Sequence, residues 1–178
     1  MTQRGRPPTG CPKWNPEKQV WEARILMPSG GRKPVPYLKT SSNQTNGRFS
    51  PDGKWIAYTS DESGHPQVYV QSYPASDDAK WQVSADGGNF AKWRRDGKEL
   101  FYLAPDGRLR ASSVRAAGKG LEFGAPATLF RILEPFGVHT YNYDVAPDGQ
   151  RILTPTPATA NSSSGLTVIL NWQGGVNH

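Results

Sequence analysis

Short runs of apolar residues alternate with turn-forming residues along this chain, and one such pattern occurs three times. The copies lie at residues 48–58, 92–102 and 144–154. In each copy a large apolar residue lies three positions before the Asp of an Asp-Gly pair, and another lies three positions after the Gly. An Asp-Gly pair between apolar runs is typical of a tight turn in which Gly takes a left-handed backbone conformation. Each copy therefore predicts a strand, a turn and a second strand.

The recurring aspartates could indicate catalytic or calcium-binding groups, but each precedes Gly in a predicted hairpin. An Asp in this place can accept hydrogen bonds from backbone N–H groups and hold the turn, which requires no ligand. We therefore predict a structural role for the turn residues, and we expect the large apolar residues near them to pack between sheets. The turn residues are Asp52, Gly53, Asp96, Gly97, Asp148 and Gly149, and the packing residues are Phe49, Trp55, Trp93 and Val145.

The spacing of the repeat predicts the architecture. The first and second aspartates are 44 residues apart, and the second and third are 52 apart. Both intervals are close to the roughly 40 to 50 residues of one four-stranded β-propeller blade. No segment sustains the 3.6-residue apolar period of an amphipathic helix. The predicted fold is all-β, a partial β-propeller of four-stranded antiparallel blades, two complete and two partial, where closed propellers have about four to eight blades.

Proline content and turn residues predict the boundaries of these parts. The first 19 residues contain four prolines among basic and small residues, so we expect them to be disordered. The half blade that follows is expected to have only its last two strands. In the second complete blade, residues 116–124 are expected to be a link between strands. The predicted parts are a disordered segment at 1–19, a half blade at 20–40, blades at 47–84 and 89–130, an incomplete blade at 139–172 with a loop at 155–165, and a tail at 173–178.

The stretch from Phe49 to Tyr58 resembles the repeat of TolB-type β-propellers, in which an apolar residue is followed by Ser-Pro-Asp-Gly-Lys, an aliphatic pair and an aromatic residue. The second copy departs from it with Arg94-Arg95 in place of Ser-Pro, and the third ends in Thr154. The resemblance extends over about residues 20–172. Residues 80–107 and 166–172 also resemble the C-terminal propeller of bacterial proteins that carry a Ser/Thr protein kinase domain upstream.

Charge and hydropathy restrict the partners and the location. The net charge is +6, and Lys and Arg are interleaved with Asp and Glu, so no nucleic-acid partner is predicted. No run approaches the roughly 18 apolar residues of a membrane span, and the first eight residues lack the apolar core of a signal peptide. The compartment therefore cannot be read from this chain, although the resemblance implies a family that is often periplasmic or extracytoplasmic.

Catalytic and metal-binding patterns are absent from the sequence. Gly120 and Gly124 have the spacing of a nucleophile elbow, but Glu122 stands where Ser is needed. There is no phosphate-binding loop and no kinase catalytic loop. A single cysteine, Cys11, allows no internal disulfide. We predict no catalytic, cofactor-binding or metal-binding residue and no enzyme activity, because the three histidines are also far apart, at His65, His139 and His178.

The sequence thus predicts a non-catalytic module for protein or ligand interaction, as a fragment of a larger sensor or envelope protein. Two alternatives stay open: an accessory propeller of a serine peptidase of the prolyl oligopeptidase type, and the sensor domain of a receptor-like Ser/Thr protein kinase. The protein partner is unknown. Self-association through the open blade edges and faces is expected, closing a ring from two copies if the curvature allows, because uncovered strand edges and apolar faces recruit other copies.

Overall fold

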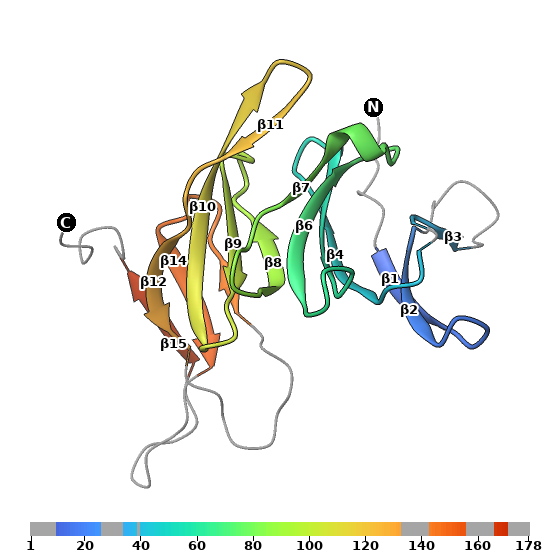
Figure 1. Ribbon diagram of the computed structural model, residues 1–178. Helices are drawn as coiled ribbons and strands as arrows, with labels where there is room; N and C mark the ends of the chain where they lie inside the picture. Colours follow the sequence, from blue (N-terminus) through green and yellow to red (C-terminus); the bar gives the residue numbers. More distant parts are fainter. Residues whose placement is uncertain (1–9, 26–33, 39, 133–142, 156–165, 171–178) are drawn as a thin grey trace, which may run out of the picture. The chain divides into compact units, whose positions relative to one another are not determined.

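The computed structural model of the protein describes five stretches of the chain: residues 10–25, 34–38, 40–132, 143–155 and 166–170. In these stretches the chain forms antiparallel strands and one short 3₁₀ helix, Asp77–Ala79, without an α-helix (Figure 1). The predicted all-β fold is confirmed. The chain divides into two compact units, Met1–Ala91 and Lys92–His178.

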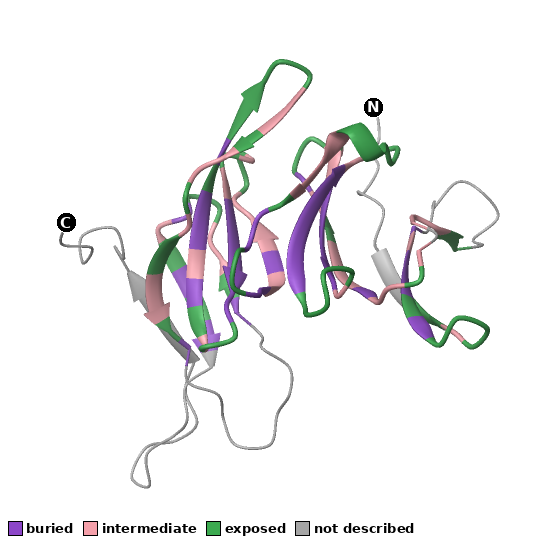
Figure 2. Cartoon of the chain, viewed as in Figure 1, coloured by how far each residue is buried: buried purple, intermediate pink, exposed green. Residues whose placement is uncertain are grey.

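The first unit contains a four-stranded antiparallel sheet that has the strand order of a propeller blade. This sheet confirms the prediction of four-stranded antiparallel blades, although its first strand begins at Gln44 instead of the expected Gly47. Both faces of its central strands are buried (Figure 2), as in a sheet packed between neighbours. The strands, in spatial order, are β4 (Gln44–Phe49), β5 (Trp55–Ser60), β6 (Gln67–Ser72) and β7 (Lys80–Gln82).

Three strands that precede this sheet form a second sheet in the same unit. β1 (Gly10–Asn15) pairs with β2 (Val20–Ile25), which pairs with β3 (Val35–Pro36). Ile25 lies in one buried cluster with Ile56 and two tyrosines of the four-stranded sheet, so the two sheets share a core.

The expectation of disorder over residues 1–19 was wrong for 10–15, which form β1, and residues 1–9 lie outside the described part. β1 is an edge strand, paired on one side only, and prolines within sheets occur mainly in edge strands. Trp14 lies directly opposite Trp21 of β2, with ring centroids 5.7 Å apart in edge-to-face geometry. Such a cross-strand aromatic pair stabilises the hairpin. The expected half blade of two strands therefore has three.

The second unit holds the sheet of the second repeat, whose first strand starts just before the unit boundary. Residues 116–124, expected to be a link, instead belong to a hairpin of β10 and β11 that projects beyond the rest of the sheet (Figure 1). Gly118, with φ of 56°, lies in its turn. The strands are β8 (Asn89–Trp93), β9 (Glu99–Leu103), β10 (Arg108–Ala117), β11 (Gly120–Phe123) and β12 (Ala127–Arg131), and β12 pairs with β10.

The third repeat forms a three-stranded antiparallel sheet in the same unit. β13 (Asp144–Val145) pairs with β14 (Arg151–Pro155), which pairs with β15 (Leu166–Leu170). The predicted loop at 155–165 was wrong for Pro155, which is the last residue of β14, and the rest of that loop and the predicted tail lie outside the described residues.

Candidate functional site

The Asp-Gly turns of the three repeats share one backbone geometry. Their glycines have φ between 73° and 74°, the left-handed region that favours Gly. In each turn the Asp Oδ1 atom accepts a hydrogen bond from the backbone N–H two residues later, and the Pro-Asp-Gly turn between β9 and β10 has the same bond. The pairs are Asp52 with Lys54 (3.1 Å), Asp96 with Lys98 (3.0 Å), Asp148 with Gln150 (2.9 Å) and Asp106 with Arg108 (3.0 Å).

The side chain two residues before the Asp differs between the repeats, and so does the way the carboxylate is bonded. In the first repeat the hydroxyl of Ser50 donates to Asp52 at 2.6 Å and accepts from the N–H of Trp55 at 3.0 Å. In the second repeat Arg94 occupies this position, and its Nε and Nη2 atoms donate to the two oxygens of Asp96 at 2.7 and 2.8 Å. The second repeat, which has Arg94-Arg95 in place of Ser-Pro, therefore still bonds the carboxylate of its turn, but through a guanidinium instead of a hydroxyl group.

Arg94 also donates to Glu99, from Nη1 to Oε2 at 2.9 Å. The hydrogen bond from Arg94 lowers the pKa of Asp96 to about 2. Burial raises the pKa of Glu99, although the guanidinium acts in the opposite direction. One guanidinium therefore joins an exposed carboxylate, fully charged at neutral pH, to a partly buried one.

The turn of the third repeat packs on this ion-pair cluster. A Cβ atom at Gly149 would lie 2.5 Å from Cδ of Arg94 and 3.3 Å from Oε2 of Glu99. Nearby, Nζ of Lys92 lies 3.2 Å from Oδ1 of Asp144 and 5.1 Å from the ring centroid of Tyr143. The β8–β9 face that carries Lys92, Arg94 and Glu99 is therefore covered by the next repeat.

Among the residues that the structure describes, none covers the corresponding face of the third repeat in the same way. By the repeat spacing, Leu153 of β14 corresponds to Ala57 and Phe101, which are both 0% exposed, whereas Leu153 is 37% exposed. An open groove with a volume of about 270 Å³ lies over this sheet. Its lining residues are Asp144, Val145, Ala146, Pro147, Arg151 and Leu153. We call the surface formed by Asp144, Ala146, Arg151 and Leu153 the open face.

The residues predicted to pack between sheets are half-buried, and the structure brings two of them into aromatic contacts. Phe49 packs against the core shared by the two sheets of the first unit, with its ring centroid 5.2 Å from that of Tyr73. Trp55 contacts Trp81 edge to face at 5.5 Å, which uses part of the surface that a stacked ligand would need. Trp93 and Val145 are likewise half-buried. Their packing role stays a prediction.

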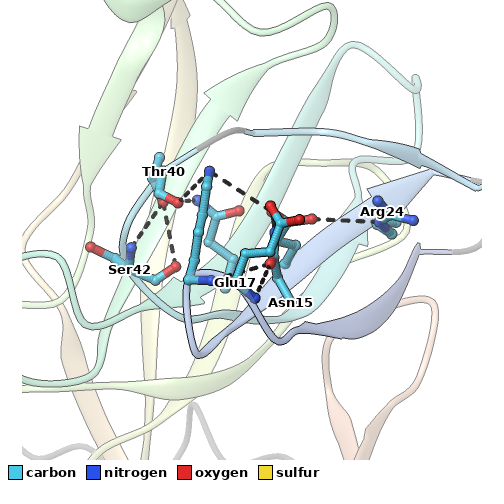
Figure 3. A network of polar contacts seen from close by, with 8 residues as sticks. Asn15, Glu17, Arg24, Thr40 and Ser42 are labelled. Carbon is cyan, nitrogen blue, oxygen red and sulfur yellow. Dashed lines mark hydrogen bonds and ion pairs between the residues drawn. The ribbon is translucent and has the colours of Figure 1, made fainter.

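A polar network that the sequence analysis did not single out surrounds Glu22 of β2, and Figure 3 shows it with Asn15, Arg24 and Thr40 labelled. Glu22 is 5% exposed, and Asn15 donates to its Oε1 atom at 2.7 Å. Lys18 lies 4.0 Å and Arg24 3.6 Å from its carboxylate oxygens, and Lys18 also donates to the carbonyl of Thr40 at 3.3 Å. These contacts compensate a buried charge, and they join the β1–β2 hairpin to the segment before β4.

Among the described residues, no group of three or more His, Cys, Asp or Glu is placed to hold a metal ion. His65 lies 2.7 Å, Nε2 to Nε2, from the buried Gln67. His139 and His178 are outside the described residues. Within the described ranges, no helix has the length and apolar character that a bilayer crossing requires.

No family model and no curated protein sequence matches this chain. Several solved structures are similar to it. TolB from Acinetobacter baumannii matches with a TM-score of 0.63 and 16% identity, over 94% of this chain and 42% of that one. A TolB protein from Agrobacterium tumefaciens matches with a TM-score of 0.55 and 17% identity, over 71% of this chain and 46% of that one. This chain has the fold of part of a TolB-type β-propeller.

A third similar structure, oligogalacturonate lyase in complex with manganese, has a TM-score of 0.58 and 14% identity, over 84% of this chain and 41% of that one. The chain thus spans less than half the length of these three structures. The lyase contradicts the prediction that the chain is not an enzyme. That prediction depended on missing hydrolase, kinase and phosphate-loop motifs, and this fold also occurs in an enzyme of a different class.

Proposed function

We propose that this chain is an interaction module of the TolB-type propeller fold, and that it binds a protein partner through the open face. The observation that supports this most directly is the exposure of Leu153, because the corresponding residues of the two preceding repeats are fully buried. Leu153 lines one groove with Val145, Ala146 and Pro147, and a contiguous apolar surface of this kind is typical of an interaction site.

The shape and lining of the groove favour a protein over a small molecule. Sites for small molecules enclose most of the ligand and present convergent polar groups. The groove here is open, most of its lining residues are apolar, and its charged groups, Asp144 and Arg151, are both exposed. A mainly apolar surface with exposed charged groups resembles the composition of a protein–protein interface.

We also propose that this chain is part of a larger protein. The likeness to TolB structures, which are more than twice as long as the matched part, supports a role as part of a larger sensor or envelope protein outside the cytoplasm. The resemblance of residues 80–107 and 166–172 to kinase-linked propellers supports the sensor role in particular.

Site-specific photo-crosslinking in the producing cells tests the proposed function. A benzophenone amino acid replaces Leu153 in the full chain, and the control carries it at Lys119, which is exposed in the β10–β11 turn. We expect a crosslinked polypeptide from position 153, identified by mass spectrometry and lost when Ala146→Arg blocks the groove. No adduct from position 153, or the same adducts from both positions, would refute the proposal.

A further inference from the structure

The open face presents its four residues in two cross-strand rows. Asp144 lies directly opposite Leu153, and the N–H of Ala146 donates to the carbonyl of Arg151 at 2.9 Å, so these two residues also face each other. The acid and the base therefore occupy one diagonal of the face, and the two apolar residues occupy the other.

The charged groups on this face are available to a partner. The side chain of Asp144 is 73% exposed and that of Arg151 is 55% exposed. Asp144 has Lys92 at 3.2 Å and Arg151 has Asp148 at 3.2 Å, but exposed ion pairs of this kind contribute little to stability. A carboxylate has several acceptor positions and a guanidinium has five donors, so both can bind a further group.

We propose that the open face docks against the same face of a second copy of this chain, related by a twofold axis. This inference rests on the proposed function and names the partner. An axis along the diagonal from Leu153 to Ala146 places each Leu153 against Leu153 of the partner subunit. The same rotation places Asp144 opposite Arg151 of the partner subunit, and the pair forms twice. A twofold interface requires a patch that is complementary to itself, and this arrangement of charges meets that requirement.

Two observations favour a second copy over an unrelated protein. The corresponding face of the second repeat, with Lys92, Arg94 and Glu99, is covered by the sheet of the third repeat, so a sheet of this chain already occupies an equivalent face. The open face also carries one acid and one base, so a purely acidic or purely basic partner would be attracted to one of them and repelled by the other. Because the face is small, we expect a weak dimer with a dissociation constant of about 10 to 100 μM.

Sedimentation equilibrium of the full chain, from about 5 to about 300 μM, tests the inference. We expect reversible dimerisation that is weakened at least about tenfold by Asp144→Arg and by Arg151→Asp, since each creates like charges across the interface. A mixture of these two variants should form a heterodimer with at least wild-type affinity. The double variant should dimerise again, and Lys119→Glu should have no effect. Thermal unfolding and the milder Arg151→Ala check that each variant is folded.

A wild-type monomer at every concentration would overturn the inference. The inference would also be overturned if the mixture of the two variants associated as weakly as either variant alone. That result is expected for a head-to-tail ring. If the wild type is monomeric and position 153 crosslinks to a different protein, docking against a second copy is refuted and the proposed function stands. A monomer without any crosslink refutes both.

Discussion

The guanidinium of Arg94 binds both carboxylate oxygens of Asp96, at 2.7 and 2.8 Å, where the first repeat uses the hydroxyl of Ser50. The same guanidinium also holds the partly buried Glu99, and the turn containing Gly149 packs on it. The residue that breaks the sequence repeat is therefore central to the contact between the second and third repeats.

Replacing Arg94 with Ala should destabilise the second unit. The substitution leaves Glu99 without its guanidinium partner and removes two bonds to Asp96, so we expect a loss of about 1 to 3 kcal/mol in the free energy of unfolding. Urea denaturation measures it, with Arg95→Ala at the exposed neighbouring position as the control. Equal losses in the two variants would contradict a special role for Arg94.

Acid should remove the stabilising contribution of Asp96. Arg94 lowers the pKa of Asp96 to about 2 in the folded chain, whereas an unfolded Asp has a pKa of about 3.9. The contribution is complete above the unfolded pKa and is lost as the pH falls toward about 2. The denaturant midpoint of the wild type should therefore drop more steeply between about pH 4 and 2 than that of Asp96→Asn. Parallel profiles would show that the carboxylate is not linked to folding.

Two glycines with the same backbone conformation separate conformational strain from packing. Gly53 and Gly149 have φ of 74° and 73°, but a Cβ atom at Gly53 meets nothing within 4 Å, whereas one at Gly149 lies 2.5 Å from Cδ of Arg94. Gly53→Ala should cost about 1 kcal/mol from its left-handed conformation. Gly149→Ala should cost about 1 to 3 kcal/mol more, because carboxylates on two sides hold the guanidinium.

Arg94→Ala provides a check on that difference. In the Arg94→Ala background the additional cost of Gly149→Ala should largely disappear, since the obstructing atom is gone. An unchanged difference between Gly149→Ala and Gly53→Ala in this background would mean that another contact limits the space at Gly149.

Trp93→Ala tests whether the large apolar residue before the second turn packs in the core. Trp93 is half-buried, so we expect about half of the roughly 3 to 5 kcal/mol that truncation of a fully buried Trp costs. Trp14→Ala, at a residue that is 43% exposed, provides the comparison. An unchanged denaturant midpoint for Trp93→Ala would favour a ligand-stacking surface formed with Trp55 and Trp81.

The sequence by itself determined the hairpins of the repeats. The left-handed Gly and the bond from Asp Oδ1 to the N–H two residues later are local, so the residues within each turn are sufficient to specify them. The second strands predicted for the copies at 48–58 and 92–102 are observed as β5 and β9, which directly follow these turns.

Only the tertiary structure decided the features that depend on distant partners. β1 forms in spite of Pro12 because β2 provides its hydrogen bonds, and β11 forms because β10 continues past the end of β9. Local pattern also cannot distinguish Leu153 from Phe101, since both follow the same turn motif. Their exposures of 37% and 0% differ because burial depends on which sheet packs against each face, and that information lies elsewhere in the chain or in another molecule.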